Sequence, residues 1–447
     1  MLAFEADWGA IESISGCSVV RFPIFYFEER IYQLLMHQQN IAMLSIHSSP
    51  VGELGTENTG GMSVYILELS KEIGKLGYSV DIFTAQTHLQ SHKIINLDQK
   101  LRVICLPIKS LKPPSKLELF EHLPDLFRSI EEFRRSQDIQ YDLIHSHYWL
   151  SGVVGNYARL EWDVPHLTTF HTLAASKNLT KSGQPDPDLR VTTENEIART
   201  SNQILVACQR EKENVRLHCQ VNQSKIKVIP CGVNYDLFRP LSKELSIQKL
   251  GLEKGKFYLL YVGRFSPVKG LDRLIYALSL LKDHRELQLL VIGGDGQASP
   301  ETQKLLTLAK KLNVQHMLCP LGRVEQAELV TYYNAADLLV VPSYYESFCM
   351  VVLEALACGT PVVATRVGAA DDIILEGKTG FVVDDNSPEL LARGVQNFLA
   401  SPMYRSLDRE LLRSSILNYS WPNIGKAIVE QYNSLVREYQ RGRESSN

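Results

Sequence analysis

Short apolar segments alternate with longer segments of helical period along most of this chain, and this alternation restricts its fold more than any other feature. Repeated strand–helix–strand units build parallel sheets with helices on their faces. In the first half, we expect strands at Ile41–Ile46, Ser79–Thr84, Arg102–Pro107, Leu143–Ser146, His166–Phe170, Ile204–Ala207 and Lys227–Ile229, and helices at Met62–Leu76, Leu123–Ser136 and Trp149–Glu161. In the second half, we expect strands at Tyr258–Val262, Gln288–Ile292, Met317–Leu318, Leu338–Val341, Val362–Ala364 and Gly380–Val382, with helices from about Leu271, Pro300, Glu325, Ser347 and Pro388. The sequence therefore predicts an α/β protein with two doubly wound, Rossmann-like domains facing across a cleft.

The 447 residues exceed the size of one ordinary hydrophobic core. We place the joint near Phe238–Pro240, which gives an N-terminal domain at 41–240 and a C-terminal domain at 241–420. A last helix within 421–447 has an apolar stripe that could pack back on the first domain. Residues 1–40 have no clear period, so we expect a leader that is either a surface segment or, with Met36 as the true start, not translated.

Charge and cysteine content exclude several functions. The 47 basic and 50 acidic residues nearly balance, which predicts neither a nucleic-acid partner nor an anionic membrane surface. The 8 cysteines lie apart, without zinc-ligand spacing, and are typical of reduced thiols in a cytosol. We also find neither a stretch of transmembrane length nor a secretory signal, so we expect a cytoplasmic protein without an integral membrane segment.

Two glutamates stand where a sheet of this kind binds ligands, at the carboxyl ends of its strands. Glu346 and Glu354 follow the apolar run Leu338–Pro342 and flank the start of an expected helix. A helix start binds phosphate through its free N–H groups, while the carboxylates can accept bonds from sugar hydroxyls. Taken alone, such a pair is more often two solvated helix charges, and only the motifs elsewhere in the chain favour the binding role.

Three further loops carry candidate binding groups. Arg264 and Lys269 follow the first strand of the second domain and could converge on one diphosphate, although two solvated cations would look the same. In the first domain, Gly60 and Gly61 allow a ligand to approach a helix start, and His171 ends an apolar strand at the edge of the sheet. The dinucleotide-binding and Walker glycine patterns are both missing from the sequence, which argues against nicotinamide cofactors and ATP hydrolysis.

Together these motifs resemble the retaining nucleotide-sugar glycosyltransferases of family 4, whose two-domain fold is called GT-B. The resemblance covers nearly everything from residue 41 to about 440. Within the family, the motifs at 47–50, 59–62, 145–152 and 171–175 are most similar to those of the inositol 3-phosphate glycosyltransferases of mycothiol biosynthesis. Sucrose-phosphate synthases share a looser version.

The resemblance implies roles for particular residues. It implies donor binding by Gly61, Arg264, Lys269, Val324, Glu346, Phe348 and Glu354, and catalysis by His171, Arg264, Lys269 and Glu346. It implies an acceptor pocket lined by His47, Asn58, Thr59, Gly60, Gly61, Met62 and Ser63, with an acceptor phosphate held by Lys116, Tyr148, Thr172 and Arg190. His171 would bond the donor sugar near its 6-hydroxyl, Glu346 its 3- and 4-hydroxyls, and Glu354 the nucleotide ribose.

The chain departs from the family pattern at three places. Asn58 stands where the inositol-phosphate enzymes have an aspartate, and Ser63 where they have an asparagine, so the recognition of acceptor hydroxyls could differ. Cys349 replaces the glycine usual in the donor motif and adds a side chain near the helix start.

The family's mechanism implies retention by front-side transfer, in which the leaving diphosphate oxygen takes the acceptor proton while Arg264 and Lys269 stabilise its charge. No cofactor is obligatory in this scheme and no metal-binding residue is predicted, although Mg²⁺ could help to neutralise the diphosphate. We therefore expect a UDP-linked nucleotide sugar and a phosphorylated small molecule as partners, and a homodimer stays open. The alternatives are transfer to fructose 6-phosphate, a lipid or polysaccharide glycosyltransferase, a sugar-nucleotide 2-epimerase and a non-catalytic sugar-nucleotide sensor.

Overall fold

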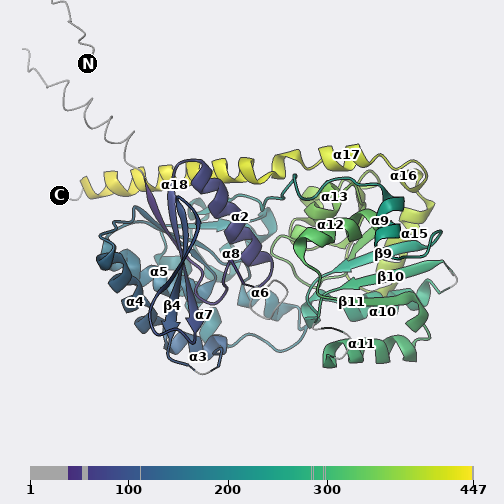
Figure 1. Ribbon diagram of the computed structural model, residues 1–447, viewed down its shortest axis with the longest axis horizontal. Coiled ribbons are helices and arrows are strands. Elements are labelled where there is room, and N and C mark those ends of the chain that lie inside the picture. The colour runs from purple at the N-terminus through teal and green to yellow at the C-terminus, as the bar shows by residue number, and fades with distance from the viewer. Residues whose placement is uncertain are drawn as a thin grey trace, which may run out of the picture. The chain divides into compact units, whose positions relative to one another are not determined.

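The computed structural model describes residues 39–52, 59–110, 112–282, 284, 286–294, 296 and 299–444. The expected leader falls outside this range except for its last two residues, and Asn58 falls outside it altogether. Gln39–Asn447 forms one compact unit. Two sheets with their helices make up this unit, and we call them the first and second domains (Figure 1).

The first domain is built on an eight-stranded sheet of order β3-β4-β2-β1-β5-β6-β7-β8. All neighbours pair in parallel except the edge strand β3, which pairs antiparallel with β4. The strands are β1 (Asn40–Leu44), β2 (Ser79–Thr87), β3 (Lys93–Asp98), β4 (Leu101–Ile108), β5 (Leu143–His147), β6 (His166–Thr169), β7 (Gln203–Val206) and β8 (Ile226–Val228).

The second domain is built on a six-stranded, fully parallel sheet of order β11-β10-β9-β12-β13-β14. Its strands are β9 (Phe257–Val262), β10 (Leu287–Ile292), β11 (Leu318–Gly322), β12 (Leu338–Val341), β13 (Val362–Thr365) and β14 (Gly380–Val383). Both sheets are thus the doubly wound parallel kind, which confirms the predicted fold class.

Helices cover both faces of each sheet. The first domain carries α2 (Gly61–Lys75), α3 (Lys116–Glu121), α4 (Leu123–Ser136), α5 (Trp149–Trp162), α6 (Ala174–Leu179), α7 (Asp188–Thr200) and α8 (Gln209–Cys219). The second carries α9 (Lys243–Lys249), α10 (Leu271–Leu280), α11 (Pro300–Lys311), α12 (Gln326–Ala335), α13 (Met350–Ala357), α14 (Ala370–Ile373), α15 (Pro388–Ala400), α16 (Pro402–Arg405) and α17 (Arg409–Ser414). Short 3₁₀ turns lie at Gln223–Lys225, Pro267–Lys269, Gln315–Met317 and Leu417–Tyr419.

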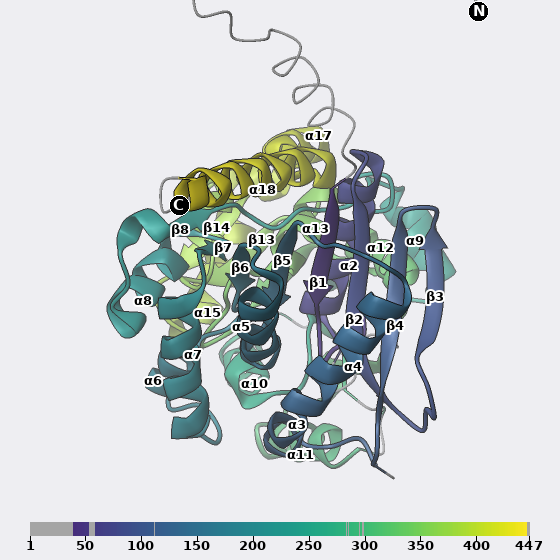
Figure 2. The same cartoon turned by 90° about the vertical axis from the view of Figure 1, so that its left-hand side faces the viewer.

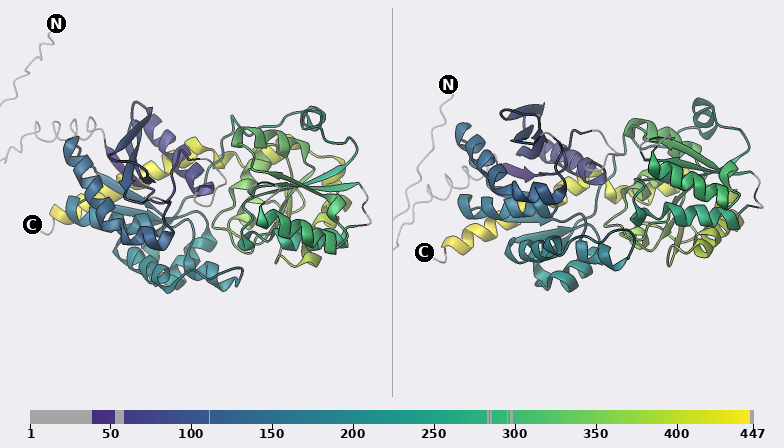
Figure 3. Two further views of the ribbon diagram at one scale, coloured as in Figure 1. Left: turned by 60° about the horizontal axis from the view of Figure 1, so that its bottom comes forward. Right: turned by 90° about the horizontal axis from the view of Figure 1, so that it is seen from below.

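The strand period of two sorts the core into layers. On β1, Ile41 and Met43 join the apolar cluster that contains α2, whereas Ala42 and Leu44 join the cluster that contains α4 and α5. The second sheet divides in the same way, with α12 and α13 on one face and α10 and α15 on the other. The turned views show helices on both sides of this sheet (Figure 3). Burial on both faces explains why the central strands are continuous apolar runs.

The last helix, α18 (Trp421–Glu444), follows the second domain in sequence but packs against α2 of the first. Its buried stripe includes Ile424, Ile428 and Tyr432. Figure 2 shows it lying across one side of the first domain, away from α4, α5 and α7. Tyr432 reaches the sheet itself, since its hydroxyl lies 2.6 Å from His145 Nδ1 on β5.

Candidate active site

Three residues at the carboxyl ends of the strands have backbone angles that side chains rarely adopt. Tyr148, directly after β5, has φ 76° and ψ 160°, a region used almost only by glycine. His171, two residues after β6, has φ 59°, and Cys349, before α13, has φ 85°. Such strain costs on the order of 1–3 kcal/mol each and persists where the surroundings hold it in place. All three lie on loops that the sequence predicted to bind ligands.

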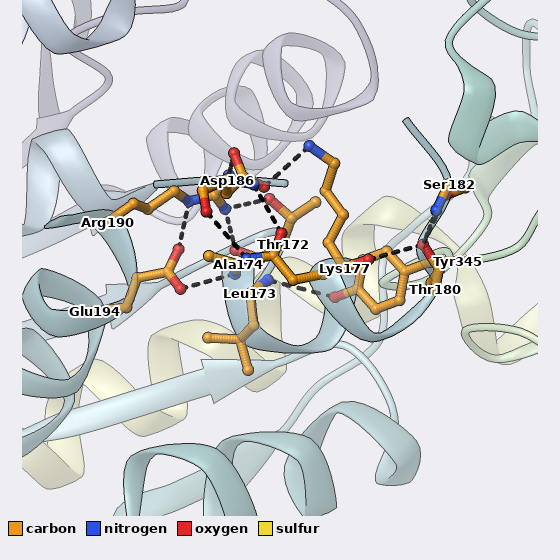
Figure 4. A network of polar contacts seen from close by, with 11 residues as sticks. Thr172, Leu173, Ala174, Lys177, Thr180, Ser182, Asp186, Arg190, Glu194 and Tyr345 are labelled. Carbon is orange, nitrogen blue, oxygen red and sulfur yellow. Dashed lines mark hydrogen bonds and ion pairs between the residues drawn. The ribbon is translucent and has the colours of Figure 1, made fainter. Parts of the chain in front are cut away.

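Arg190 on α7 is the centre of a polar network in the first domain (Figure 4). Its Nε donates to Glu194 Oε1 at 2.7 Å, and its Nη1 donates to Asp186 Oδ1 at 3.0 Å. Its Nη2 donates to both the carbonyl and the hydroxyl of Thr172 at 2.9 Å. Only 3% of Arg190 is exposed, so these bonds fix the guanidinium in a single orientation.

The ring of Tyr148 lies at the meeting point of the predicted phosphate-binding residues. The guanidinium carbon of Arg190 is 4.6 Å from the ring centre and Lys116 Nζ is 5.9 Å from it. The ring of His47 packs against Tyr148 at 4.2 Å. The structure therefore brings Lys116, Tyr148, Thr172 and Arg190 together from four separate segments of the chain.

Two carboxylates share this cluster with the cations. Although burial alone would raise the pKa of Asp186, the charges and hydrogen bonds of Arg190 and Lys177 hold it below its usual value. Burial raises the pKa of Glu194, whose other oxygen accepts from the N–H of Ala174. The three cations Arg190, Lys177 and Lys116 thus outnumber the two carboxylates, which leaves the cluster favourable for an anion.

Histidines form a second layer beside this cluster. His171 Nε2 lies 2.9 Å from His147 Nδ1, and the edge of Tyr65 from α2 packs on the His171 ring at 5.1 Å. Burial lowers the pKa of His171 to about 3. At neutral pH the ring is therefore uncharged and acts only through hydrogen bonds.

The predicted acceptor loop is described from Thr59 onward. Gly60 precedes α2 and Gly61 begins it; a side chain at Gly61 would meet only Met350 Sδ at 3.8 Å, which leaves the helix start open to a ligand. Ser63, which the resemblance places in the acceptor pocket, is fully buried, and its hydroxyl lies 2.7 Å from that of Ser48. Met62 is half-buried.

The donor loops of the second domain meet at an ion pair. Lys269 Nζ lies 2.7 and 2.8 Å from the two carboxylate oxygens of Glu346, and the Ser343 hydroxyl donates to the same carboxylate at 2.7 Å. Gly270 makes this approach possible: its φ is +64°, and an added Cβ would lie 2.0 Å from the carbonyl oxygen of Pro342. Arg264 lies on the same loop with an exposed side chain.

The second glutamate has a different environment. Glu354 on α13 is 7% exposed and accepts a bond of 2.7 Å from the hydroxyl of Tyr333. Burial raises its pKa to about 7. The other predicted donor residues contribute mostly packing surface: Phe348 is buried and Val324 is half-buried against the core.

Loops of the two domains touch each other beside these groups. The hydroxyl of Tyr345, next to Glu346, accepts from the N–H of Leu173, next to Thr172, at 3.4 Å (Figure 4). Cys208 Sγ donates to the carbonyl of Ser347 at 3.3 Å. The candidate donor and acceptor groups are therefore neighbours in space.

Sequence reasoning missed several members of the site. Asp186 and Glu194 stand four residues before and after the predicted Arg190, and Glu194 shares one face of α7 with it, a spacing that could have indicated the ion pairs. Tyr333 and Tyr345 gave no local signal, because their contacts arise from segments distant in sequence. Among the described residues, no group of three potential metal ligands comes together, and no helix has the length and apolar character needed to cross a bilayer.

Comparisons with known proteins agree with this geometry. The family model described as "Glycosyltransferase Family 4" matches residues 59–237, and the one described as "Glycosyl transferases group 1" matches 242–412. The D-inositol 3-phosphate glycosyltransferase of Corynebacterium glutamicum is 34% identical over 406 residues, which cover 89% of this chain and 97% of that protein. The corresponding protein of Corynebacterium jeikeium is 35% identical over 411 residues, covering 90% and 98%.

Solved structures match over similar lengths. Sucrose-phosphate synthase from Thermosynechococcus elongatus has a TM-score of 0.82 at 30% identity and covers 90% of this chain and 100% of its own. Anabaena HepE, solved in complex with UDP and glucose, has a TM-score of 0.69 at 19% identity and covers 89% and 100%, a likeness of fold alone.

Proposed function

This chain belongs to the glycosyltransferases of family 4, and from that premise we propose that it moves a hexosyl or N-acetylhexosaminyl group from a UDP-sugar to a phosphorylated polyol or sugar, such as inositol 3-phosphate, with retention. The observation that carries the proposal is the convergence of Lys116, Tyr148, Thr172 and Arg190 at the carboxyl edge of the first sheet, beside the donor loops of the second.

The acceptor phosphate would bind where the cations outnumber the carboxylates. Arg190 is already fixed by Glu194, Asp186 and Thr172, so little rotamer entropy would be lost when a phosphate arrives. Lys116 and the Tyr148 hydroxyl would supply further charge-assisted bonds. The polyol ring would then extend toward His47 and the start of α2.

The donor would reorganise the Lys269–Glu346 pair. A diphosphate oxygen would take the ammonium of Lys269, which would free Glu346 to accept bonds from hydroxyls of the donor sugar. Glu354, held by Tyr333, would accept a bond from the ribose. This division of tasks follows from the half-buried position of the pair and the buried position of Glu354.

In the proposed reaction, the bond between the anomeric carbon and the diphosphate oxygen breaks as the acceptor oxygen bonds to the same carbon on the same face. The leaving oxygen takes the acceptor proton, and Lys269 and Arg264 stabilise the charge that grows on it. His171 is neutral and would hold the sugar through a hydrogen bond rather than act as an acid. We propose that no cofactor is obligatory, that Mg²⁺ would act only by neutralising the diphosphate, and that the enzyme is cytoplasmic.

One specific observation favours a second acceptor. The TM-score of 0.82 to a sucrose-phosphate synthase supports fructose 6-phosphate as an alternative phosphorylated acceptor in the same pocket. Both candidates share the phosphate, and they differ in whether a polyol ring or a sugar meets the acceptor loop.

A screen of UDP- and GDP-sugars against inositol 3-phosphate, fructose 6-phosphate and the unphosphorylated acceptors tests the proposal. Product formation with a UDP-sugar and a phosphorylated acceptor, with the anomeric configuration retained by NMR, is the expected result. Transfer that ignores the phosphate would overturn the acceptor assignment, and an inverted product would overturn the mechanism.

A further inference from the structure

His147, the last residue of β5, is a fully buried polar residue with an incomplete set of hydrogen bonds. Its Nδ1 lies 2.9 Å from His171 Nε2. Its Nε2 is buried, and no described group bonds to it. An imidazole with one nitrogen bonded to a site residue and the other enclosed can influence the site only through that one bond.

The surroundings hold the His147 ring in place. The ring of His145 packs against it, tilted by 42° and with the ring centres 4.1 Å apart, and His145 is itself fixed by the Tyr432 hydroxyl at 2.6 Å and the Thr169 hydroxyl at 2.9 Å. Tyr65 packs edge-on against both His147 and His171. Neither ring can turn without displacing its neighbours, so the contact between the two histidines is a fixed feature of the fold.

The position of one proton decides the chemistry of this contact. Burial lowers the pKa of His147 well below its usual value, so the ring is neutral and carries one N–H. If the proton were on Nε2, a buried N–H would face no described acceptor. If the proton is on Nδ1, the Nδ1–H donates to His171 Nε2, and the buried Nε2 of His147 keeps only an unused lone pair. Orphaned buried N–H groups are rarer than orphaned acceptors, so the second arrangement is favoured.

We propose, resting on the function proposed above, that His147 is a positioning residue which donates its Nδ1–H to His171 and thereby places the proton of His171 on Nδ1. His171 then presents a fixed N–H donor on the side of its ring away from His147. A donor of this kind matches an oxygen of the bound sugar. It also prevents His171 from accepting the acceptor proton, which agrees with the leaving oxygen as the proton acceptor.

Nitrogen-15 NMR of the ligand-free protein tests the tautomer directly, with His171 signals identified by their loss in His171→Gln. In the wild type, His171 should be protonated on Nδ1. His147→Leu should release this preference, whereas His147→Asn, whose side-chain amide can donate from near the Nδ1 position, should keep it. A wild-type His171 protonated on Nε2, or an unchanged tautomer in His147→Leu, would overturn the proposal. If the leucine variant does not fold, the wild-type spectrum alone decides.

Kinetics separate positioning from packing. His147→Leu should lower kcat about tenfold, the lower end of the range for losing a partner that orients a functional histidine, with the acceptor KM unchanged. His147→Asn should recover most of that loss. Equal damage by both variants would indicate a packing role and overturn the proposal. Because the tautomer is measured without substrates, failure of the proposed transfer reaction and failure of this inference are distinguishable.

Discussion

The two domains hold their cations in different ways at the carboxyl ends of their strands. We call these ends the first edge, in the first domain, and the second edge, in the second domain. In the first domain, the Arg190 side chain is 4% exposed and is bonded to two carboxylates and to Thr172. In the second domain, the Lys269 side chain is 25% exposed and meets the single carboxylate of Glu346, which is 13% exposed. The first edge is built before its ligand arrives, whereas the second must exchange an internal partner for a ligand. A substitution at the first should therefore affect folding as well as binding, and one at the second mainly catalysis.

The largest expected effect is on the stability of the first edge. Arg190→Ala would leave Glu194, whose side chain is 2% exposed, without its cation, and breaking a buried pair in this way costs about 3–5 kcal/mol. Urea unfolding measures the loss. Arg199→Ala on the same helix is the matched control, since its pair with Glu196 is largely exposed and worth less than about 1 kcal/mol. Equal effects of the two variants would remove the distinction between the edges.

The second edge should show the opposite pattern. Lys269→Ala should raise the barrier to transfer by roughly 3 kcal/mol, the scale for losing one stabiliser of developing charge, while lowering urea stability less than Arg190→Ala does, because the Lys269–Glu346 pair is less buried. Glu346→Gln should also slow transfer. Lys256→Ala is the control, because that lysine is 22% exposed and pairs with Glu253 and Glu286 away from the site. Near-normal turnover of Lys269→Ala would contradict the donor assignment.

A pH effect of similar or smaller size is expected from Glu354. Its folded-state pKa of about 7 is above the ordinary 4.5, so the folded protein holds the proton more tightly than the unfolded chain does. Stability should therefore fall as pH rises from about 4.5 through 7, by up to about 3 kcal/mol for this group. Glu354→Gln should be no more stable than the wild type near pH 4.5 and increasingly more stable above it.

In the first domain, burial likewise raises the pKa of Glu211 to about 7, so the same measurement of stability against pH can be made on that residue. Glu211→Gln should show the same dependence on pH. A Glu354→Gln variant whose stability differs from the wild type equally at all pH values would show that folding does not raise the pKa of the Glu354 carboxyl. A loss of UDP affinity in Glu354→Gln, measured separately, would support the contact between Glu354 and the ribose.

Acceptor recognition should depend on Lys116 without the folding loss expected for Arg190. Lys116→Met should raise the KM of a phosphorylated acceptor about tenfold, because one charge-assisted bond is worth on the order of 1.5 kcal/mol at a half-buried position. Lys112→Met, an exposed lysine on the same segment, should have no effect. A rise in the KM of the donor instead would mean that Lys116 binds the donor and not the acceptor.

The smallest effect is expected at Cys349. Glycine would relieve the strain of φ 85°, but it would also remove a side chain that is 6% exposed and make the unfolded chain more flexible. These terms nearly offset, so Cys349→Gly should change the unfolding free energy by about 1 kcal/mol or less and leave UDP affinity intact. A loss well above that value would show that the Cys349 side chain has a packing role the backbone strain conceals.

Much of the fold was predictable because the central strands are buried on both faces and so appear as apolar runs. The edge strand β3 was not predicted, since five of its six residues are exposed and give no apolar pattern. The helix expected from Ser347 begins at Met350, because Cys349 adopts a left-handed conformation that α-helix cannot include. The strand at Met317–Leu318 is instead Leu318–Gly322, after a 3₁₀ turn.

The candidate site was predictable to a lesser degree. Loops at the carboxyl ends of parallel strands must lie near one another, so the grouping of Lys116, Tyr148, Thr172 and Arg190 follows from topology once the family motifs are seen. Their partners do not follow in this way. The sequence shows Arg190 as a cation, but only the structure shows that it is held by Asp186 and Glu194 and that Ser63 is turned into the core.

The central claim is that the first edge recognises a phosphate on the acceptor while the second holds the donor. The most direct test compares kcat/KM for inositol 3-phosphate with that for free inositol, at a saturating UDP-sugar, in the wild type and in Lys116→Met. We predict a strong preference for the phosphorylated acceptor that shrinks about tenfold in the variant, with the donor KM unchanged. Equal use of the two acceptors by the wild type would contradict the account.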